Sequence, residues 1–386
     1  MRIRGWATVI VFFLGVVAAA RAQLAVAATD NRLVLADGVE RLRAHPAPDT
    51  FVVLDLNGPA PRKLAEVTGV PASVVGPPFS VALTPDGTLA LDTSCMKADP
   101  ADPSKQVFDD RITVIDLSNP QAPSVIAILH SGPGPAGVAI NRRGNLALVA
   151  DRGDGSVAVF SIFGHMVIPA GKLQVGNAAS ALGEVAFCPG GRRALVTRTG
   201  DGIITVLKVD GDRVTLAGRD VRAGQRPYGV DVSGDGRFAV VASDGGGPRG
   251  DGTVSVIDLA HGPARTVETR TVGRASAGIA LSPDGSLCAV VAENGGNVAH
   301  VPPFSPPQGM LVLFLVRGER LKRVAEAPTG PWPQGVVFSR DGHWIVVCNR
   351  SEKDLQPFSW DGSRLAETLR PIGLGGGPVA IRTADP

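Results

Sequence analysis

The chain has 386 residues, of which 48 are glycine and 31 are proline, while 44% are hydrophobic, 19% are charged and the formal net charge is +2. This balance excludes a disordered chain, which needs few apolar and many charged residues. Long Leu-, Glu- and Lys-rich stretches at helical spacing are missing, which argues against a helical bundle. The composition therefore predicts many short strands joined by many turns.

The first 22 residues have the three parts of a secretory signal. Arg2 and Arg4 give a positive start, residues 5–20 form a mostly apolar run, and Ala20-Arg-Ala22 is a small-x-small cleavage sequence. The apolar run is shorter than the roughly 20 residues that span a bilayer, so we expect cleavage rather than an anchor. We predict an exported protein, periplasmic or secreted, with one mature domain over residues 23–386 and no membrane span.

Cleavage would also change the charge of the chain. The signal holds three of the 38 basic residues and no acid, which leaves 35 basic residues against 36 acidic ones and a formal charge of −1. No basic stripe remains, so we expect neither nucleic acid nor anionic lipid as a partner. Ala25-Val-Ala27 is an alternative cleavage sequence.

A short motif recurs seven times along the mature chain, with copies that begin at residues 80, 137, 183, 229, 278, 335 and 378. Clear copies are Gly229-Val-Asp-Val-Ser-Gly-Asp-Gly236, Gly278-Ile-Ala-Leu-Ser-Pro-Asp-Gly285 and Gly335-Val-Val-Phe-Ser-Arg-Asp-Gly342. The complete copies read as a strand, a tight turn that ends in glycine, most often Asp-Gly, and a second apolar strand. A regular repeat of this length indicates that each copy forms one structural unit.

Two more strands complete each unit. A third strand follows a polar loop, as at residues 253–259, and a weaker, more polar fourth strand follows it, as at residues 267–272. Four antiparallel strands that repeat every 40 to 57 residues are typical of a β-propeller. The sequence thus predicts an all-β protein, a seven-bladed β-propeller of four-stranded antiparallel blades.

The two ends of the chain supply the seventh blade together. The last copy is truncated to one inner strand at residues 379–381, and the mature start offers strands at residues 33–36, 51–56 and 63–67. We expect the C-terminal inner strand to join these N-terminal strands, because such a closing blade leaves no open sheet edge between the first and last blades.

The repeat at residues 229–236 and the strand Thr253-Val-Ser-Val-Ile-Asp-Leu-Ala260 resemble the YVTN-type propeller repeat. That group overlaps the lactonase-like seven-bladed propellers related to bacterial phosphogluconolactonase. The resemblance covers nearly the whole mature chain, although the aromatic residue of the family's Tyr-Val-x-Asn strand is missing here. It implies the propeller fold and, as one possible activity, the handling of a lactone.

A binding site in such a fold is expected on one face, where the loops between second and third strands meet the loops that enter the inner strands. Charged, polar and aromatic residues at these loops are the candidates. For catalysis they are Arg198, Glu293 and Asp151, and for ligand binding they are Arg152, Tyr228, Asp244, Asn294, Trp332 and Arg350. Several arginines among acids and aromatics would suit a small anionic ligand, and they would equally suit ion pairs that tie the blades together.

Three functions from different classes fit this pattern. The first is an exported binding protein whose loop face takes a protein, a glycan or a small anionic ligand. The second, implied by the resemblance, is a lactone-hydrolysing enzyme in which an arginine polarises the carbonyl and Glu293, Asp151 or His300 is the general base. The third, also by resemblance, is a partner of a redox enzyme, as in amine-dehydrogenase heavy chains.

We expect no cofactor and no metal, because the six histidines are scattered singly and no Cys-x-x-Cys-His haem motif is present. The four cysteines lie far apart in the sequence. Cys288 and Cys348 fall within apolar strands, where they are expected to be buried free thiols.

Overall fold

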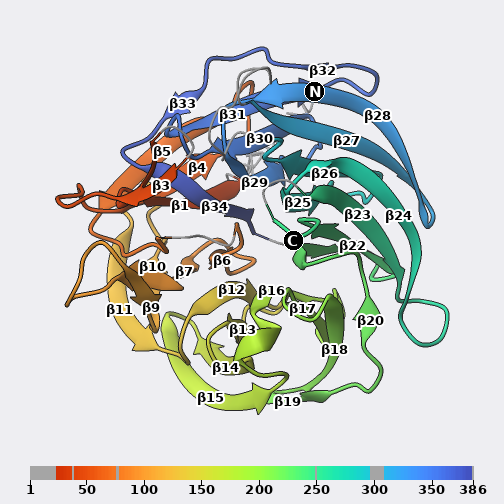
Figure 1. Ribbon diagram of the computed structural model, residues 1–386, viewed down its shortest axis with the longest axis horizontal. Helices are drawn as coiled ribbons and strands as arrows, with labels where there is room; N and C mark the ends of the chain where they lie inside the picture. Colours follow the sequence, from red (N-terminus) through yellow and green to blue (C-terminus); the bar gives the residue numbers. More distant parts are fainter. Residues whose placement is uncertain (1–22, 37–38, 75–77, 248–249, 296–307, 385–386) are drawn as a thin grey trace, which may run out of the picture.

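The computed structural model describes residues 23–36, 39–74, 78–247, 250–295 and 308–384. The expected signal at residues 1–22 and His300 lie outside these ranges. Seven antiparallel sheets surround a central axis like blades, so the prediction of a seven-bladed β-propeller is confirmed (Figure 1). Helical structure in the described ranges is limited to the short 3-10 turn η1 (Ala178–Ser180), and no described helix has the length and apolar character to cross a membrane.

The blades are numbered from the closing blade, and in each the four strands run outward from the axis. The seven inner strands, in blade order, are β34 (Gly377–Thr383), β6 (Val81–Leu83), β12 (Pro135–Ile140), β16 (Leu182–Phe187), β21 (Pro227–Val232), β25 (Ser276–Leu281) and β29 (Pro333–Phe338). The second strands are β1 (Leu24–Asp30), β7 (Leu89–Thr93), β13 (Leu146–Asp151), β17 (Arg193–Arg198), β22 (Phe238–Ser243), β26 (Leu287–Ala292) and β30 (Trp344–Asn349).

The third and outer strands complete the sheets, and two outer strands are split in two. The third strands are β4 (Thr50–Asp55), β10 (Arg111–Asp116), β14 (Ser156–Phe163), β18 (Ile203–Asp210), β23 (Asp251–Asp258), β27 (Gly309–Arg317) and β31 (Asp354–Trp360). The outer strands are β5 (Arg62–Thr68), β11 (Ser124–His130), β15 (Met166–Gln174), β19 (Arg213–Leu216) with β20 (Val221–Arg222), β24 (Arg265–Arg274), β28 (Arg320–Thr329), and β32 (Leu365–Ala366) with β33 (Ile372–Gly373).

The closing blade forms from both ends of the chain, as expected, but with a different second strand. Strand β34 pairs with β1 from Ala25 opposite Thr383 to Asp30 opposite Gly377, with one shift of register between Ala28 and Thr29. The prediction that residues 33–36 belong to this blade is wrong. They form β2 (Leu33–Ala36), which pairs only with β3 (Val39–Leu42) in a hairpin inserted between β1 and β4.

The run Leu24-Ala-Val-Ala-Ala28 explains this difference, because small and branched apolar residues suit a strand covered on both faces. All five residues are buried. The alternative cleavage sequence, Ala25-Val-Ala27, therefore lies in the middle of a blade strand.

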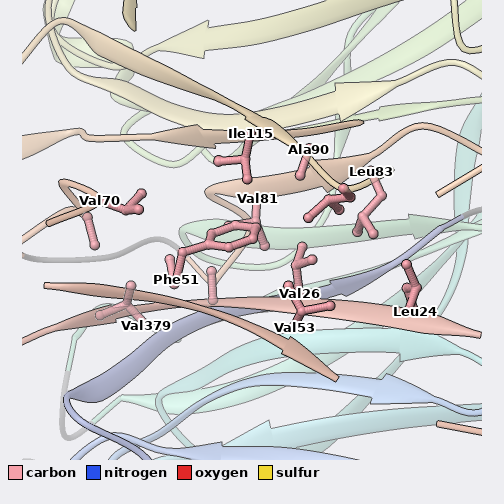
Figure 2. Close-up of a cluster of buried hydrophobic side chains, with 14 residues drawn as sticks. Leu24, Val26, Phe51, Val53, Val70, Val81, Leu83, Ala90, Ile115 and Val379 are labelled. Carbon is pink, nitrogen blue, oxygen red and sulfur yellow. The ribbon is translucent and has the colours of Figure 1, made fainter. Parts of the chain in front are cut away.

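The core lies between neighbouring blades. Alternate residues of β1 point to opposite faces, so Val26 packs toward blade 2 while Ala25 and Ala27 pack toward blade 7. Figure 2 shows Phe51 of blade 1 beside Val81 of blade 2, and the Phe51 side chain is fully buried. Full burial of such a side chain contributes about 1.5–3 kcal/mol. Because both faces of each blade are covered, the apolar runs in the sequence are continuous.

All four cysteines are free and buried in the structure. Cys288 and Cys348 lie within β26 and β30, and neither side chain is exposed to solvent. The expectation of buried free thiols at these two positions is confirmed.

Candidate functional site

The loops that enter the inner strands and the loops between second and third strands lie on one side of the molecule, called here the loop face. The central channel opens there into a cavity of about 450 Å³. Six of the nine candidate residues line this cavity, namely Arg152, Tyr228, Asp244, Glu293, Trp332 and Arg350. These six residues belong to blades 3, 5, 6 and 7, so the fold brings distant parts of the chain to a single site.

Irregular backbone at the start of the inner strands aims side chains into this cavity. The pairing of β21 shifts register between Pro227 and Gly229, and Tyr228 lies at this bulge. The same shift in β29, between Pro333 and Val336, includes Gln334, which also lines the cavity. A bulge turns a side chain away from the regular alternation of a strand, which is why bulges are common beside functional sites.

The residue just before an inner strand adds backbone strain at the same rim. Arg226 has φ 56°, Ala275 has φ 50° and Trp332 has φ 55°, all in the left-handed region that disfavours residues with a Cβ atom. All three line the cavity. Strained backbone of this kind costs on the order of 1–3 kcal/mol per residue and persists only where the surrounding structure holds it in place.

Glu293 follows β26, and its pKa is the most strongly shifted among the acids that line the cavity. Burial raises its pKa from 4.5 to about 8, and the nearby charges of Asp244 and Glu40 act in the same direction. The Gln334 Nε2 atom donates a hydrogen bond to Glu293 Oε1 at 3.1 Å. At neutral pH the carboxyl is therefore mostly protonated, but a fraction close to one tenth is ionised and can accept a proton.

Tyr228 and Arg152 lie on the same cavity. Burial raises the pKa of Tyr228 to about 12, with the Arg152 charge opposing the shift, so the phenol stays protonated and can donate a hydrogen bond. Arg152 Nη1 donates to the carbonyl oxygens of Ala181 at 3.1 Å and Leu182 at 3.2 Å, at the entry to the next blade. These contacts hold the guanidinium in a fixed position at the channel.

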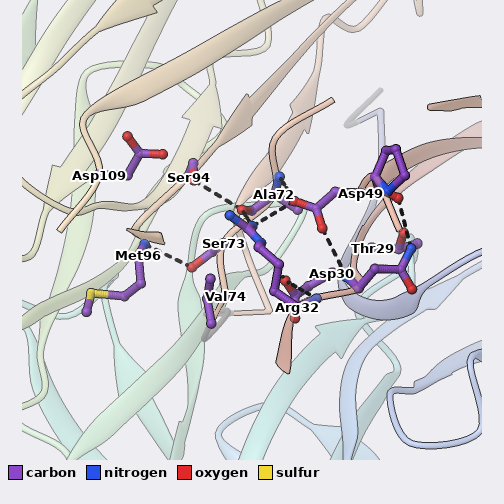
Figure 3. Close-up of polar contacts among 12 residues, drawn as sticks. Thr29, Asp30, Arg32, Asp49, Ala72, Ser73, Val74, Ser94, Met96 and Asp109 are labelled. Atoms are coloured by element: carbon purple, nitrogen blue, oxygen red, sulfur yellow. Dashed lines mark hydrogen bonds and ion pairs between the residues drawn. The ribbon is translucent and has the colours of Figure 1, made fainter. Parts of the chain in front are cut away.

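Arg350 is held by a buried polar cluster that joins blades 7 and 1. Its Nη2 atom lies 2.8 Å from Asp30 Oδ2, and its guanidinium lies 4.4 Å from the centre of the Trp332 ring. Asp30 also pairs with Arg32 at 3.0 Å, and Arg32 pairs with Asp49 at 2.7 Å (Figure 3). The cluster fixes one wall of the cavity, and the charge of Arg350 is already balanced within it.

Most of the other charges at the cavity also have partners. Arg226 Nε lies 3.0 Å from Asp244 Oδ2. For Arg152, by contrast, no carboxylate of the described residues lies within ion-pair distance. Within the described part of the cavity, Arg152 is thus the arginine that backbone carbonyls hold without a carboxylate partner, and it shares the cavity with the mostly protonated Glu293.

The remaining three candidates lie outside the residues that line the cavity. Asp151 is buried and accepts hydrogen bonds from the Ser131 and Ser156 hydroxyl groups. Burial raises the pKa of Asp151 to about 6.

Arg198 forms ion pairs with Asp201 and Asp220, which fits the alternative reading of the arginines as structural residues. Asn294 is an exposed turn residue with φ 50°. These two positions and Asp151 stay predictions without support from the geometry.

Two hairpins bring residues to the cavity that the sequence did not indicate individually. Met96 and Phe108 belong to the hairpin of β8 (Met96–Ala98) and β9 (Gln106–Phe108), which lies between the second and third strands of blade 2. Glu40 comes from the β2–β3 hairpin. The sequence interpretation missed Glu40 because it assigned residues 33–36, the first strand of this hairpin, to a blade and gave residues 39–42 no strand.

One group among the described residues has the geometry to hold a metal ion, and it lies outside the cavity. It consists of Asp258, His261 and Glu319. Asp258 Oδ2 also lies 3.0 Å from Arg265 Nη2, and this positive charge disfavours a bound cation.

Solved structures of similar shape support the fold. A candidate 6-phosphogluconolactonase from Bacteroides fragilis is 16% identical, with a TM-score of 0.70, over 95% of this chain and 99% of that one. The periplasmic gluconolactonase of Pseudomonas aeruginosa is 17% identical, with a TM-score of 0.68, over 94% and 99%. No protein-family model matches the chain, and no curated protein matches it either. At these identities the likeness confirms a lactonase-like propeller fold and leaves the activity open.

Proposed function

We propose that this protein hydrolyses a small lactone in the loop-face cavity. The observation that carries the proposal is that Glu293, whose pKa of about 8 suits proton transfer near neutral pH, lines the same cavity as two hydrogen-bond donors. The donors are the Tyr228 phenol and the Arg152 guanidinium. Similar folds described as gluconolactonases support the choice of lactones as the substrate class.

The chemistry needs one proton shuttle and one oxyanion site. Ionised Glu293 takes a proton from a water molecule as that water attacks the lactone carbonyl. Arg152 and Tyr228 stabilise the negative charge that develops on the carbonyl oxygen. The ring C–O bond then breaks, and Glu293 returns the proton to the departing ring oxygen. The product is a hydroxy acid, and Glu293 ends in the ionised form in which it began.

The charges of the cavity favour an uncharged substrate. Arg350 is neutralised by Asp30 and Arg226 by Asp244, so Arg152 is the one cation of the described lining without a carboxylate partner, and Glu40 adds a negative charge. Among the described residues, this cavity has no cluster of unpaired cations that could bind a phosphate dianion. A single cation is enough to stabilise the partial charge of a carbonyl oxygen. Met96, Phe108 and Trp332 add an apolar wall. We therefore expect neutral lactones to be preferred over phosphorylated ones.

The test is a hydrolysis assay with the purified mature chain on a neutral aldonolactone, an alkyl-substituted γ-lactone and a phosphorylated sugar lactone. Glu293→Gln should lower kcat by about 100-fold or more, the usual contribution of a positioned acid–base group. Glu326→Gln, on the exposed outer strand β28, is the matched control and should leave kcat unchanged. In the wild type, log kcat should rise with pH and level off near pH 8.

Equal loss of activity in both variants, or none in either, would refute the role of Glu293. Tight binding of a lactone without turnover would instead favour the second candidate, a ligand-binding protein. That candidate is supported by the two hairpins that enlarge the loop face around the cavity. Co-purification of a protein or glycan that competes with the lactone would identify such a partner.

We also propose that the protein acts after export, in the periplasm or outside the cell. The features of residues 1–22 support this, and a mature chain that begins at Gln23 would keep β1 (Leu24–Asp30) whole. Sequencing the amino terminus of protein from the periplasmic fraction checks it. A chain that still begins at Met1 and stays in the cytosol would contradict it.

A further inference from the structure

The central channel has a second opening on the side opposite the loop face, where the inner strands turn into the second strands. A cavity of about 140 Å³ lies there, lined by residues from all seven blades, whose inner strands surround the axis in Figure 1. Its charged lining residues are Arg142, Arg340, Arg382, Glu184 and Asp231. Three positive and two negative charges give this opening, called here the turn-face mouth, a formal charge of +1.

Both carboxylates of the turn-face mouth are already engaged within the protein. Glu184 forms an ion pair with Arg382 and accepts a hydrogen bond from the Val230 backbone N–H. Asp231 accepts backbone hydrogen bonds from Val232 and Leu281, each at 2.8 Å. Neither acid is placed to neutralise the other two arginines.

Those two arginines, Arg142 and Arg340, occupy the same position of a repeated turn. In six blades a four-residue turn joins the inner and second strands, and the N–H of its fourth residue, always glycine, bonds to the carbonyl of the first. The second residue of these turns, in chain order, is Pro85, Arg142, Pro189, Gly234, Pro283 or Arg340.

Proline is favoured at this turn position because its fixed φ suits the turn. Arginine brings no such advantage, so turn formation does not account for Arg142 and Arg340. Both depart from the repeat, both carry a positive charge and both line the same cavity. These three shared features point to a common ligand.

The surroundings of these side chains leave them able to bind one. Arg142 Nη1 donates to the carbonyl oxygen of Gly234, at 3.2 Å, so its guanidinium reaches from blade 3 toward blade 5. The backbone N–H of Arg340 is held by the Gln23 side chain. Among the residues that the structure describes, no carboxylate lies within ion-pair distance of either guanidinium.

We infer that the turn-face mouth is a binding site for a compact oxyanion, of the size of inorganic phosphate or a short dicarboxylate. Arginine binds such oxygens through paired N–H donors, and the small cavity limits the size of the ligand. The inference does not depend on the proposed lactone hydrolysis. The buried Phe79 ring contacts Tyr228 edge-on, with 5.9 Å between centroids, and lies 5.0 Å from the Arg382 guanidinium, so it separates the two cavities.

The test is calorimetric titration of the mature protein with inorganic phosphate and, separately, with malonate, both at constant ionic strength set with chloride. We expect one site per chain. An Arg142→Gln/Arg340→Gln double variant should bind at least about tenfold more weakly, because hydrogen bonds to charged groups are lost. Arg143→Gln, an exposed arginine in the same turn but outside the cavity, is the matched control and should bind like the wild type.

Absence of a saturable signal from both anions in the wild type would overturn the inference. An equal effect of the control and the double variant would also overturn it, since that result indicates a general charge effect. Unfolding midpoints of the variants without anion show whether each one folds. Lactone turnover should be the same in all three proteins, which keeps this result separate from the proposed function.

Discussion

The raised pKa of Glu293 makes a prediction about stability that does not depend on any substrate. Below pH 4.5 the carboxyl is protonated in both the folded and the unfolded chain. Between pH 4.5 and about 8 it ionises in the unfolded chain but stays protonated in the folded one. The unfolded chain then binds fewer protons, so the free energy of unfolding falls as pH rises through this window.

The size of the effect follows from the same pKa values. A difference between 4.5 and about 8, at about 1.36 kcal/mol per pH unit, sets an upper limit of about 5 kcal/mol. The side chain borders a solvent-connected cavity, where water screens part of this cost, so we expect about 2 kcal/mol. Glu293→Gln cannot ionise and should keep its stability over this range.

The assay is urea unfolding of wild type and Glu293→Gln from pH 4.5 to pH 9. The variant should gain about 2 kcal/mol relative to the wild type by pH 8, with no further change above it. Glu40→Gln removes one of the charges that raise the Glu293 pKa, and should therefore make the fall in stability with pH shallower. The stability difference between Glu293→Gln and wild type could instead stay constant with pH, within about 0.5 kcal/mol. That result would refute the conclusion that the Glu293 carboxyl stays protonated in the folded chain.

Two further predictions concern the packing that supports the site. Arg350→Met should lower the free energy of unfolding by about 3 kcal/mol, measured by urea titration, because it leaves Asp30 buried with one ion-pair partner fewer. An unchanged unfolding midpoint would show that this ion pair makes no net contribution to stability. Gly278→Ala should cost about 3 kcal/mol, since its Cβ would lie 2.1 Å from the Gln334 carbonyl oxygen, whereas Gly171→Ala, with open space around it, should stay within about 0.5 kcal/mol of wild type. Equal midpoints for the two alanine variants would contradict this packing argument.

Much of the fold could be read from the sequence, because the blades repeat the same strands and six of the seven repeat a tight turn that ends in glycine. The loop face was also predictable, since it follows from the order of strands within a blade. The strand Leu24–Asp30 was missed because it follows directly on the signal-like segment and has the same small apolar composition. The β2–β3 hairpin then took its place in the prediction.

The candidate site could be predicted only as a set of loop-end residues. Arg152 and Arg350 occupy equivalent positions, each directly after a second strand, yet Arg350 pairs with the Asp30 carboxylate whereas Arg152 is held by the backbone carbonyls of Ala181 and Leu182. A repeat pattern cannot distinguish them, because their partners come from loops that differ between blades. The shifts of register that aim Tyr228 and Gln334 inward likewise depend on pairing between strands.

The sequence alone determined the architecture, the number of blades and the joining of the C-terminal inner strand to N-terminal strands, but not which N-terminal strand lies beside it. These depend on local features, namely strand periodicity and turn residues, and their regular spacing repeats the information in every blade. The tertiary structure decided which charges are neutralised, which side chains meet at the channel and which carboxyl is buried. Those properties depend on distances between residues far apart in the chain, such as Arg350 and Asp30, and on burial by neighbouring blades.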